Sequence, residues 1–179
     1  MKRNSLFRPC SLLLSLKQSG NLLLLPLAFV LFLSHAVPSA GSDGYTKYCN
    51  PRFGFCVEYP ASLTKDPPPA NNDGISLRDR DAFTMSASGI NNVLDDTVES
   101  LMSAGIENMD RVTYKSKGRD WFVLSGFDGT KVRYEKTWVG KGSINTLFIE
   151  YQADQKSKYD EIAARVSRSF KPGRLNTGN

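Results

Sequence analysis

The stretch that decides the fold runs from residue 121 to residue 151 and reads WFVLSGFDGTKVRYEKTWVGKGSINTLFIEY. Two turn signals divide it into three segments, because Asp128-Gly129 is typical of a tight hairpin and Gly140-Lys141-Gly142 turns the chain again. The first segment is apolar throughout, which predicts a central strand covered on both faces. The other two segments, 131–139 and 144–151, alternate apolar and polar residues, which predicts strands with one buried face.

Three shorter strands are predicted upstream of this stretch. Residues 75–78 and 83–87 are separated by a polar turn, and 112–115 precede a turn at Lys117-Gly118. The connections between neighbouring strands are too short for parallel crossovers, except where a helix intervenes. The sequence therefore predicts a mostly antiparallel sheet.

Two helices are predicted, at about 96–106 and 157–170. In the first, Asp96 is the expected cap and Glu99 completes a capping-box pattern. In the second, Ser157 is the expected cap and Pro172-Gly173 ends the helix. Both segments carry apolar residues at helical spacing. Two helices combined with antiparallel strands make an α+β sandwich.

The first 40 residues have the character of a signal peptide. They hold four cations and no acidic residue, followed by an apolar core and small residues. The expected cleavage site follows Ala36 or Ala40. The core, Leu22 to Leu33, is about a dozen residues long, and a spanning helix needs roughly 20. An uncleaved anchor is the alternative. Residues 41–173 then form one domain, with a disordered tail at 174–179.

Charge argues against nucleic acid as a partner. The chain has a net charge of +5, but four of its 23 basic residues lie in the predicted signal. The remainder holds 19 basic and 18 acidic residues, which is close to neutral. Phosphate neutralisation dominates nucleic-acid affinity, so this domain lacks the cationic surplus that it requires.

The cysteines agree with export. Once the signal is removed, Cys49 and Cys56 remain, and an even count in an oxidising compartment indicates a bridge. The Asn-Pro and Gly between them mark a turn, so residues 44–49 and 55–59 are predicted to form a hairpin. The bridge closes a short loop and contributes about 2–3 kcal/mol. The alternatives are two buried thiols or a redox pair, although the Cys-x-x-Cys spacing is absent.

Catalytic machinery is not evident in the mature part. The chain's one histidine, His35, lies in the signal, which removes the commonest general base and metal ligand. We expect no enzyme activity, no metal and no cofactor. Two alternatives stay open: a hydrolase using carboxylates (Asp79 and Asp81, or Asp95 and Asp96) or a Ser-Lys pair in a sheet–helix cleft, and a carrier that holds a small apolar ligand in the aromatic interior.

Two turns offer residues of the types found at protein interfaces. Arg52 and Phe53 lie at the tip of the predicted hairpin, and Arg78 and Arg80 lie at another turn. If the two turns are adjacent, they form an arginine-aromatic patch for a protein partner. The alternative is solvated turn charges with Phe53 packed inward.

Four segments together resemble a known family: Asn50–Pro60, Asn71–Ile75, Trp121–Gly126 and Tyr159–Phe170. They are an aromatic-rich hairpin ending in Tyr-Pro, an Asn-Asn-Asp-Gly-Ile turn, the Trp-Phe-Val-Leu-Ser-Gly strand and a Tyr-Asp-x-Ile…Ser-Phe helix. This pattern resembles the bacterial periplasmic branch of the PsbP-like superfamily, whose fold is shared with a Ran-binding nuclear import factor. The resemblance implies an α/β/α sandwich and an accessory or binding role. The cysteine pair departs from the family pattern.

These observations predict a non-enzymatic, periplasmic or secreted protein. Its expected partner is another protein in the cell envelope or outside the cell, and a narrower version makes it an adaptor or immunity partner of a secreted effector. Membrane contact is expected only through the signal segment, if that is uncleaved. Fold likeness alone does not carry function.

Overall fold

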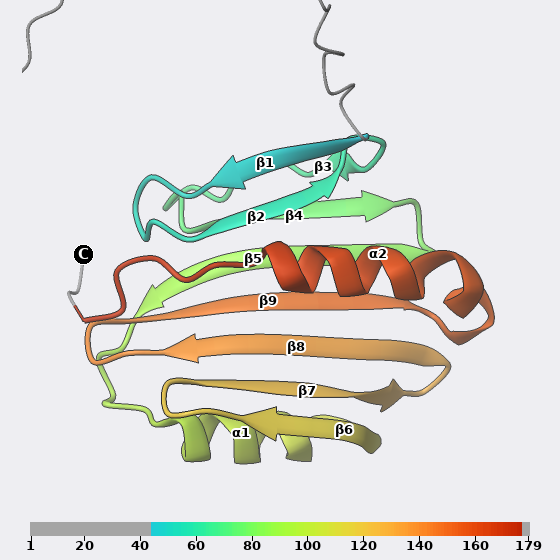
Figure 1. Cartoon of the computed structure of the whole chain (residues 1–179). Coiled ribbons are helices and arrows are strands. Elements are labelled where there is room, and N and C mark those ends of the chain that lie inside the picture. The colour runs from blue at the N-terminus through green and yellow to red at the C-terminus, as the bar shows by residue number, and fades with distance from the viewer. Residues whose placement is uncertain (1–43, 177–179) are drawn as a thin grey trace, which may run out of the picture. The chain divides into compact units, whose positions relative to one another are not determined.

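A seven-stranded antiparallel sheet organises the domain, with strand order β3-β4-β5-β9-β8-β7-β6 (Figure 1). The computed structural model describes residues 44–176, so the predicted signal segment 1–40 and residues 177–179 lie outside the described residues. The strands of the sheet are β3 (Thr64–Lys65), β4 (Gly74–Asp79), β5 (Phe83–Asn91), β6 (Arg111–Lys117), β7 (Trp121–Asp128), β8 (Lys131–Val139) and β9 (Ser143–Gln152).

Elements cover both faces of this sheet, which confirms the predicted α+β class and the α/β/α sandwich. Helix α2 (Lys156–Ser169) follows the short 3-10 turn η1 (Ala153–Gln155) and packs on β8 and β9. Figure 1 shows α2 in front of the sheet and α1 (Val98–Glu107), which packs on β7, behind it. Neither helix in residues 44–176 is long and apolar enough to cross a membrane.

A disulfide-bonded hairpin flanks α2. Strands β1 (Tyr45–Cys49) and β2 (Cys56–Pro60) pair antiparallel, with Cys49 directly opposite Cys56. The two cysteines are bonded as the sequence predicts, with their Cα atoms 4.1 Å apart. On its other edge β2 bridges to Lys171, because Cys56 and Lys171 exchange two backbone hydrogen bonds. The hairpin is therefore tied to the chain that leaves α2.

The main core lies between the sheet and the layer formed by α2 and the hairpin. The alternating residues of the hairpin segment are all buried, as their spacing predicts. They are Phe53, Phe55, Val57 and Tyr59. From α2, Tyr159, Ala163, Val166 and Phe170 enter the same cluster. Aromatic rings fill this interior, with Phe83 and Tyr159 stacked at 4.9 Å between centroids. The space that the carrier hypothesis requires is thus occupied by the protein's own side chains.

Strand β7 is apolar on both faces but is not central, which corrects the prediction for residues 121–127. It is the penultimate strand, and β9 holds the middle position. Its apolar character has another cause: Phe122 and Leu124 lie under α1, while the Trp121 ring lies at a tilt beside the Trp138 ring on the opposite face. The predicted loop after β2 also contains the short strand β3, which no sequence pattern indicates.

The cap of α1 is Thr97 rather than Asp96. The hydroxyl of Thr97 accepts a hydrogen bond from the backbone N–H of Ser100 at 3.1 Å, and the Ser100 hydroxyl accepts from the N–H of Thr97 at 3.0 Å. The capping box is therefore formed by Thr97 and Ser100, one position later than predicted. Glu99 instead pairs with Lys117 on β6.

Thr97→Ala is expected to lower the free energy of unfolding by about 1 kcal/mol, because it leaves an N-terminal amide of α1 without its acceptor. Asp96→Ala is the matched control and is expected to cost about half as much, through loss of a carboxylate near the helix N-terminus. Urea unfolding followed by circular dichroism measures both. A larger loss for Asp96→Ala than for Thr97→Ala would contradict the assignment of the cap.

Two further boundaries differ from the predictions. Helix α2 begins at Lys156 directly from η1, with Gln155 at its N-cap and no capping side chain, so Ser157 is not the cap. The tail predicted as disordered from Arg174 is held at its start. The N–H of Arg174 donates to the carbonyl oxygen of Phe53 at 3.1 Å, and the carbonyl oxygen of Leu175 accepts from the N–H of Gly142 at 2.8 Å.

Candidate functional site

The structure does not bring the two predicted arginine turns together. Arg52 donates to the carbonyl oxygen of Asn71, just before β4, whereas Arg78 and Arg80 lie at the other end of that strand. A strand of this length separates its ends by roughly 15–20 Å. Phe53 is only 1% exposed, so it belongs to the core and not to a docking surface. The condition for a single arginine-aromatic patch is therefore not met.

Of the four carboxylates considered from the sequence, Asp79 and Asp96 accept hydrogen bonds from neighbouring side chains. Asp79 accepts hydrogen bonds from Lys158 and Tyr159, both at 2.8 Å. These bonds, with Lys158 contributing most, hold the pKa of Asp79 below its usual range, so this carboxyl is not poised as a general acid. Within residues 44–176 there is no group of three or more His, Cys, Asp or Glu side chains arranged to hold a metal ion.

A serine and a lysine do meet in the cleft between the sheet and α2, but not as a catalytic pair. Lys136 Nζ donates to the backbone carbonyl oxygen of Ser167 at 3.0 Å. The Ser167 hydroxyl is hydrogen-bonded to the hydroxyl of Tyr134. A general base must reach the proton that it abstracts. Among the described residues Tyr134, and not Lys136, is the hydrogen-bond partner of that hydroxyl.

An exposed apolar pair projects from the turn between β5 and α1, residues 92–96. Val93 is 81% exposed and Leu94 is 80% exposed, the highest values among the large apolar residues of the described chain. Ile90, at the end of β5, is 53% exposed. Single exposed apolar residues are ordinary on protein surfaces. Two adjacent aliphatic side chains that are almost wholly in water are a less common feature.

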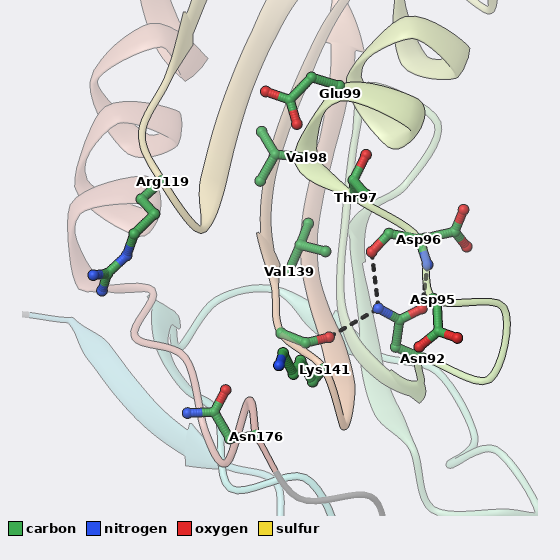
Figure 2. A pocket seen from close by; sticks show the side chains of 11 residues that line it. Asn92, Asp95, Asp96, Thr97, Val98, Glu99, Arg119, Val139, Lys141 and Asn176 are labelled. Atoms are coloured by element: carbon green, nitrogen blue, oxygen red, sulfur yellow. Dashed lines mark hydrogen bonds between the residues drawn. The ribbon is translucent and has the colours of Figure 1, made fainter.

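Asn92 holds the 92–96 turn in place from below (Figure 2). Its side chain is buried, and its Nδ2 donates to the carbonyl oxygens of Asp96 at 2.9 Å and of Gly140 at 2.8 Å. Its Oδ1 accepts from the N–H of Asp96 at 2.8 Å. The backbone N–H of Asn92 donates to the carbonyl oxygen of Gly142 at 3.1 Å. The turn is therefore fixed both to itself and to the β8–β9 connection.

The charge around the 92–96 turn is divided between two walls of a shallow cavity of about 520 Å³. Carboxylates of the turn and of the first turn of α1 lie on one side, and Figure 2 shows Arg119 and Lys141 on strand connections across from them. Asp95 has a positive φ of 54° and Asp96 follows it directly. Lys117 lowers the pKa of Glu99 through a 2.5 Å hydrogen bond. Asp95 and Asp96 directly follow Val93 and Leu94 in the chain, so they place negative charge beside the apolar pair.

Sequence patterns do not predict a site at this turn. They indicate Asp96 as a helix cap and leave Asp95 and Asp96 open as a carboxylate pair, and they give Val93 and Leu94 no role. A signal was present, because an isolated apolar pair stands between Asn91-Asn92 and Asp95-Asp96 without the spacing of a strand or helix. Only the structure shows that the pair points into solvent rather than beneath α1.

Comparison with known proteins establishes the fold. No family model matches the sequence, and neither does any curated protein. Among solved structures, the chain is similar to the solution structure of cyanobacterial PsbP (CyanoP) from Synechocystis sp. PCC 6803, with 15% sequence identity and a TM-score of 0.56. The match covers 75% of this chain and 95% of that one. The chain has a PsbP-like fold, which confirms the resemblance at the level of fold, and its place in a bacterial periplasmic branch stays a prediction.

Proposed function

We propose that this domain is a non-enzymatic, exported accessory protein that docks onto another protein of the cell envelope or outside the cell through its 92–96 turn. The observation that carries the proposal is the pair Val93 and Leu94, which is about 80% exposed on a turn locked by buried Asn92. The Cys49–Cys56 disulfide is typical of compartments outside the cytoplasm and supports export.

Binding through this turn is energetically favourable because little has to be ordered. Full burial of one aliphatic side chain of this size contributes about 1.5–3 kcal/mol. Ordering a loop at an interface normally offsets part of such a gain. Here the hydrogen bonds of Asn92 already fix the backbone in the free protein. Ordering of the turn therefore offsets little of the free energy gained by burying Val93 and Leu94.

The flanking charges specify the partner's chemistry. Asp95 and Asp96 adjoin the apolar pair, so a complementary partner offers an apolar recess with Arg or Lys at its rim. The same carboxylates disfavour an anionic lipid surface, which attracts basic and repels acidic segments. A protein partner is therefore favoured over a membrane. An adaptor or immunity role for a secreted effector is a narrower form of this proposal.

The double variant Val93→Ser/Leu94→Ser is expected to lose at least tenfold in the amount of partner recovered with the tagged protein from the native cell envelope after chemical crosslinking. Its stability should stay within about 0.5 kcal/mol of the wild type, because both side chains are in water. The control Val93→Ile/Leu94→Met keeps an apolar surface and should retain the partner. Equal recovery with the serine variant would overturn the proposal.

A further inference from the structure

An aromatic groove lies on the α2 face of the sheet, whereas α1 packs on the opposite face. It has a volume of about 420 Å³ and is bounded by β6, β7 and β8 on its floor and by α2 on one wall. It exists because α2 packs over β8 and β9, while the end of the sheet formed by β6 and β7 extends beyond the helix. Its lining residues are Tyr114, Trp121, Val123, Tyr134, Lys136 and Trp138, with Ser167 from α2.

The groove is lined by aromatic rings that are partly exposed. The rings of Trp121 and Trp138 lie side by side, with centroids 6.2 Å apart, and Tyr114 is 57% exposed. The indole N–H of Trp138 is buried and has no acceptor among the described residues. Native proteins leave few buried donors unpaired, and each one requires an explanation such as a ligand or a bound water. Aromatic-lined grooves of this kind are the sites that proline-rich extended segments occupy.

The groove continues along α2 for the length of a short peptide. A second cavity of about 400 Å³ shares Tyr134 and Ser167 with it and reaches Val132 at the start of β8. The distance from Trp138 to Val132 along the strand is roughly 20 Å. A polyproline segment rises about 3.1 Å per residue, so about six residues of such a segment span the groove.

The groove carries uncompensated positive charge. Lys136 lines it and Arg168 lines its continuation. Neither has a carboxylate partner within residues 44–176. The acid in the groove's continuation, Asp160, is already paired with Lys156. An acidic ligand would therefore supply the carboxylates that these basic side chains lack in the folded domain.

We propose that this groove binds an extended, proline-containing segment of a partner protein that carries acidic residues. The prolines stack on Trp121 and Trp138, and carboxylates of the segment pair with Lys136 and Arg168. This surface is distinct from the 92–96 turn, so the domain has two separate contact sites. An acidic polysaccharide is the alternative ligand, because it carries the same negative charge as the proposed segment. It has no proline rings to stack on the tryptophans and no amide carbonyls.

Intrinsic fluorescence tests this proposal directly, because Trp121 and Trp138 are the only two tryptophans of the chain. The probe is a synthetic nonapeptide of three Pro-Pro-Asp repeats, titrated into the purified folded protein. We expect a saturable fluorescence change. A peptide with Lys for Asp and one with Ala for Pro should each bind at least tenfold more weakly. The Val93→Ser/Leu94→Ser variant should give the same titration as the wild type, which separates this proposal from the proposed function.

Charge reversal supplies the second arm of the test. Arg168→Glu changes an exposed side chain near the end of α2, so the fold should persist. We expect it to weaken binding of the acidic peptide at least tenfold and to improve binding of the lysine peptide. Absence of a saturable change with the acidic peptide, equal affinity for all three peptides, or tighter binding of oligogalacturonate than of the acidic peptide would overturn the proposal.

Discussion

Phe53→Ala is expected to lower the free energy of unfolding by about 3–5 kcal/mol, the range for removing a fully buried phenylalanine. The ring is 1% exposed and lies over Gly89 of β5, so closely that a methyl group on that glycine would come within 2.3 Å of it. Arg52 stacks on it, with the guanidinium 4.9 Å from the ring centroid. Because the β1–β2 turn and the sheet enclose the ring together, a cavity at this point cannot easily collapse.

The measurement is urea unfolding followed by far-ultraviolet circular dichroism at neutral pH. Phe53→Leu is the matched control, since it keeps most of the apolar volume and should cost less than half as much. A loss below 1 kcal/mol for Phe53→Ala would contradict the placement of this ring in the core. It would also restore the interpretation of Phe53 as a surface residue.

Loss of the Cys49–Cys56 disulfide is expected to lower the free energy of unfolding by about 2–3 kcal/mol. The bond joins residues seven apart, and closing a loop of this size lowers the entropy of the unfolded chain and raises its free energy by about that amount. The hairpin has other attachments, including the bridge from Cys56 to Lys171 and a hydrogen bond from the Tyr48 hydroxyl to the carbonyl oxygen of Gly74. We therefore expect a destabilised but folded domain.

Unfolding of Cys49→Ser/Cys56→Ser, compared with the wild type before and after reduction, measures this effect. Reduced wild type should match the double variant to within about 0.5 kcal/mol, which is the size of ordinary surface effects. Reduction of the double variant itself should have no effect. If reduction left the stability of the wild type unchanged, the disulfide would not be a structural element of the domain.

Local pattern predicted most of the fold. The alternation in 131–139 and 144–151 identified β8 and β9, and the Asp128-Gly129 signal placed the turn between β7 and β8. These predictions succeeded because side-chain direction in a strand has a period of two and depends only on neighbouring residues. The cysteine hairpin was predicted for the same reason, since its turn and its alternation are both local.

The errors concern features that depend on distant residues. The position of β7 in the sheet depends on which strands pair with β9, and its apolar sequence is explained equally well by α1 on one face and aromatic rings on the other. The cap of α1 moved by one residue because Asn92 holds the N–H of Asp96 from a turn outside the helix.

The surroundings of the candidate-site residues also depend on contacts between distant parts of the chain. The exposure of Val93 and Leu94 follows from the anchoring of Asn92 to Gly140, which is 48 residues away. The aromatic groove requires residues of three strands and α2 to meet. The arginine patch required two turns to be adjacent, and the pairing of β4 and β5 places them at opposite ends of β4.

Site-specific photocrosslinking in the native cells is the most direct test of docking through the 92–96 turn. A photoreactive amino acid is placed at Leu94 and, as a control, at the exposed residue Glu161 on α2. We predict one discrete protein adduct from position 94, absent from position 161 and lost when Asn92→Ala frees the turn. No adduct from position 94, or the same adducts from both positions, would contradict the central claim.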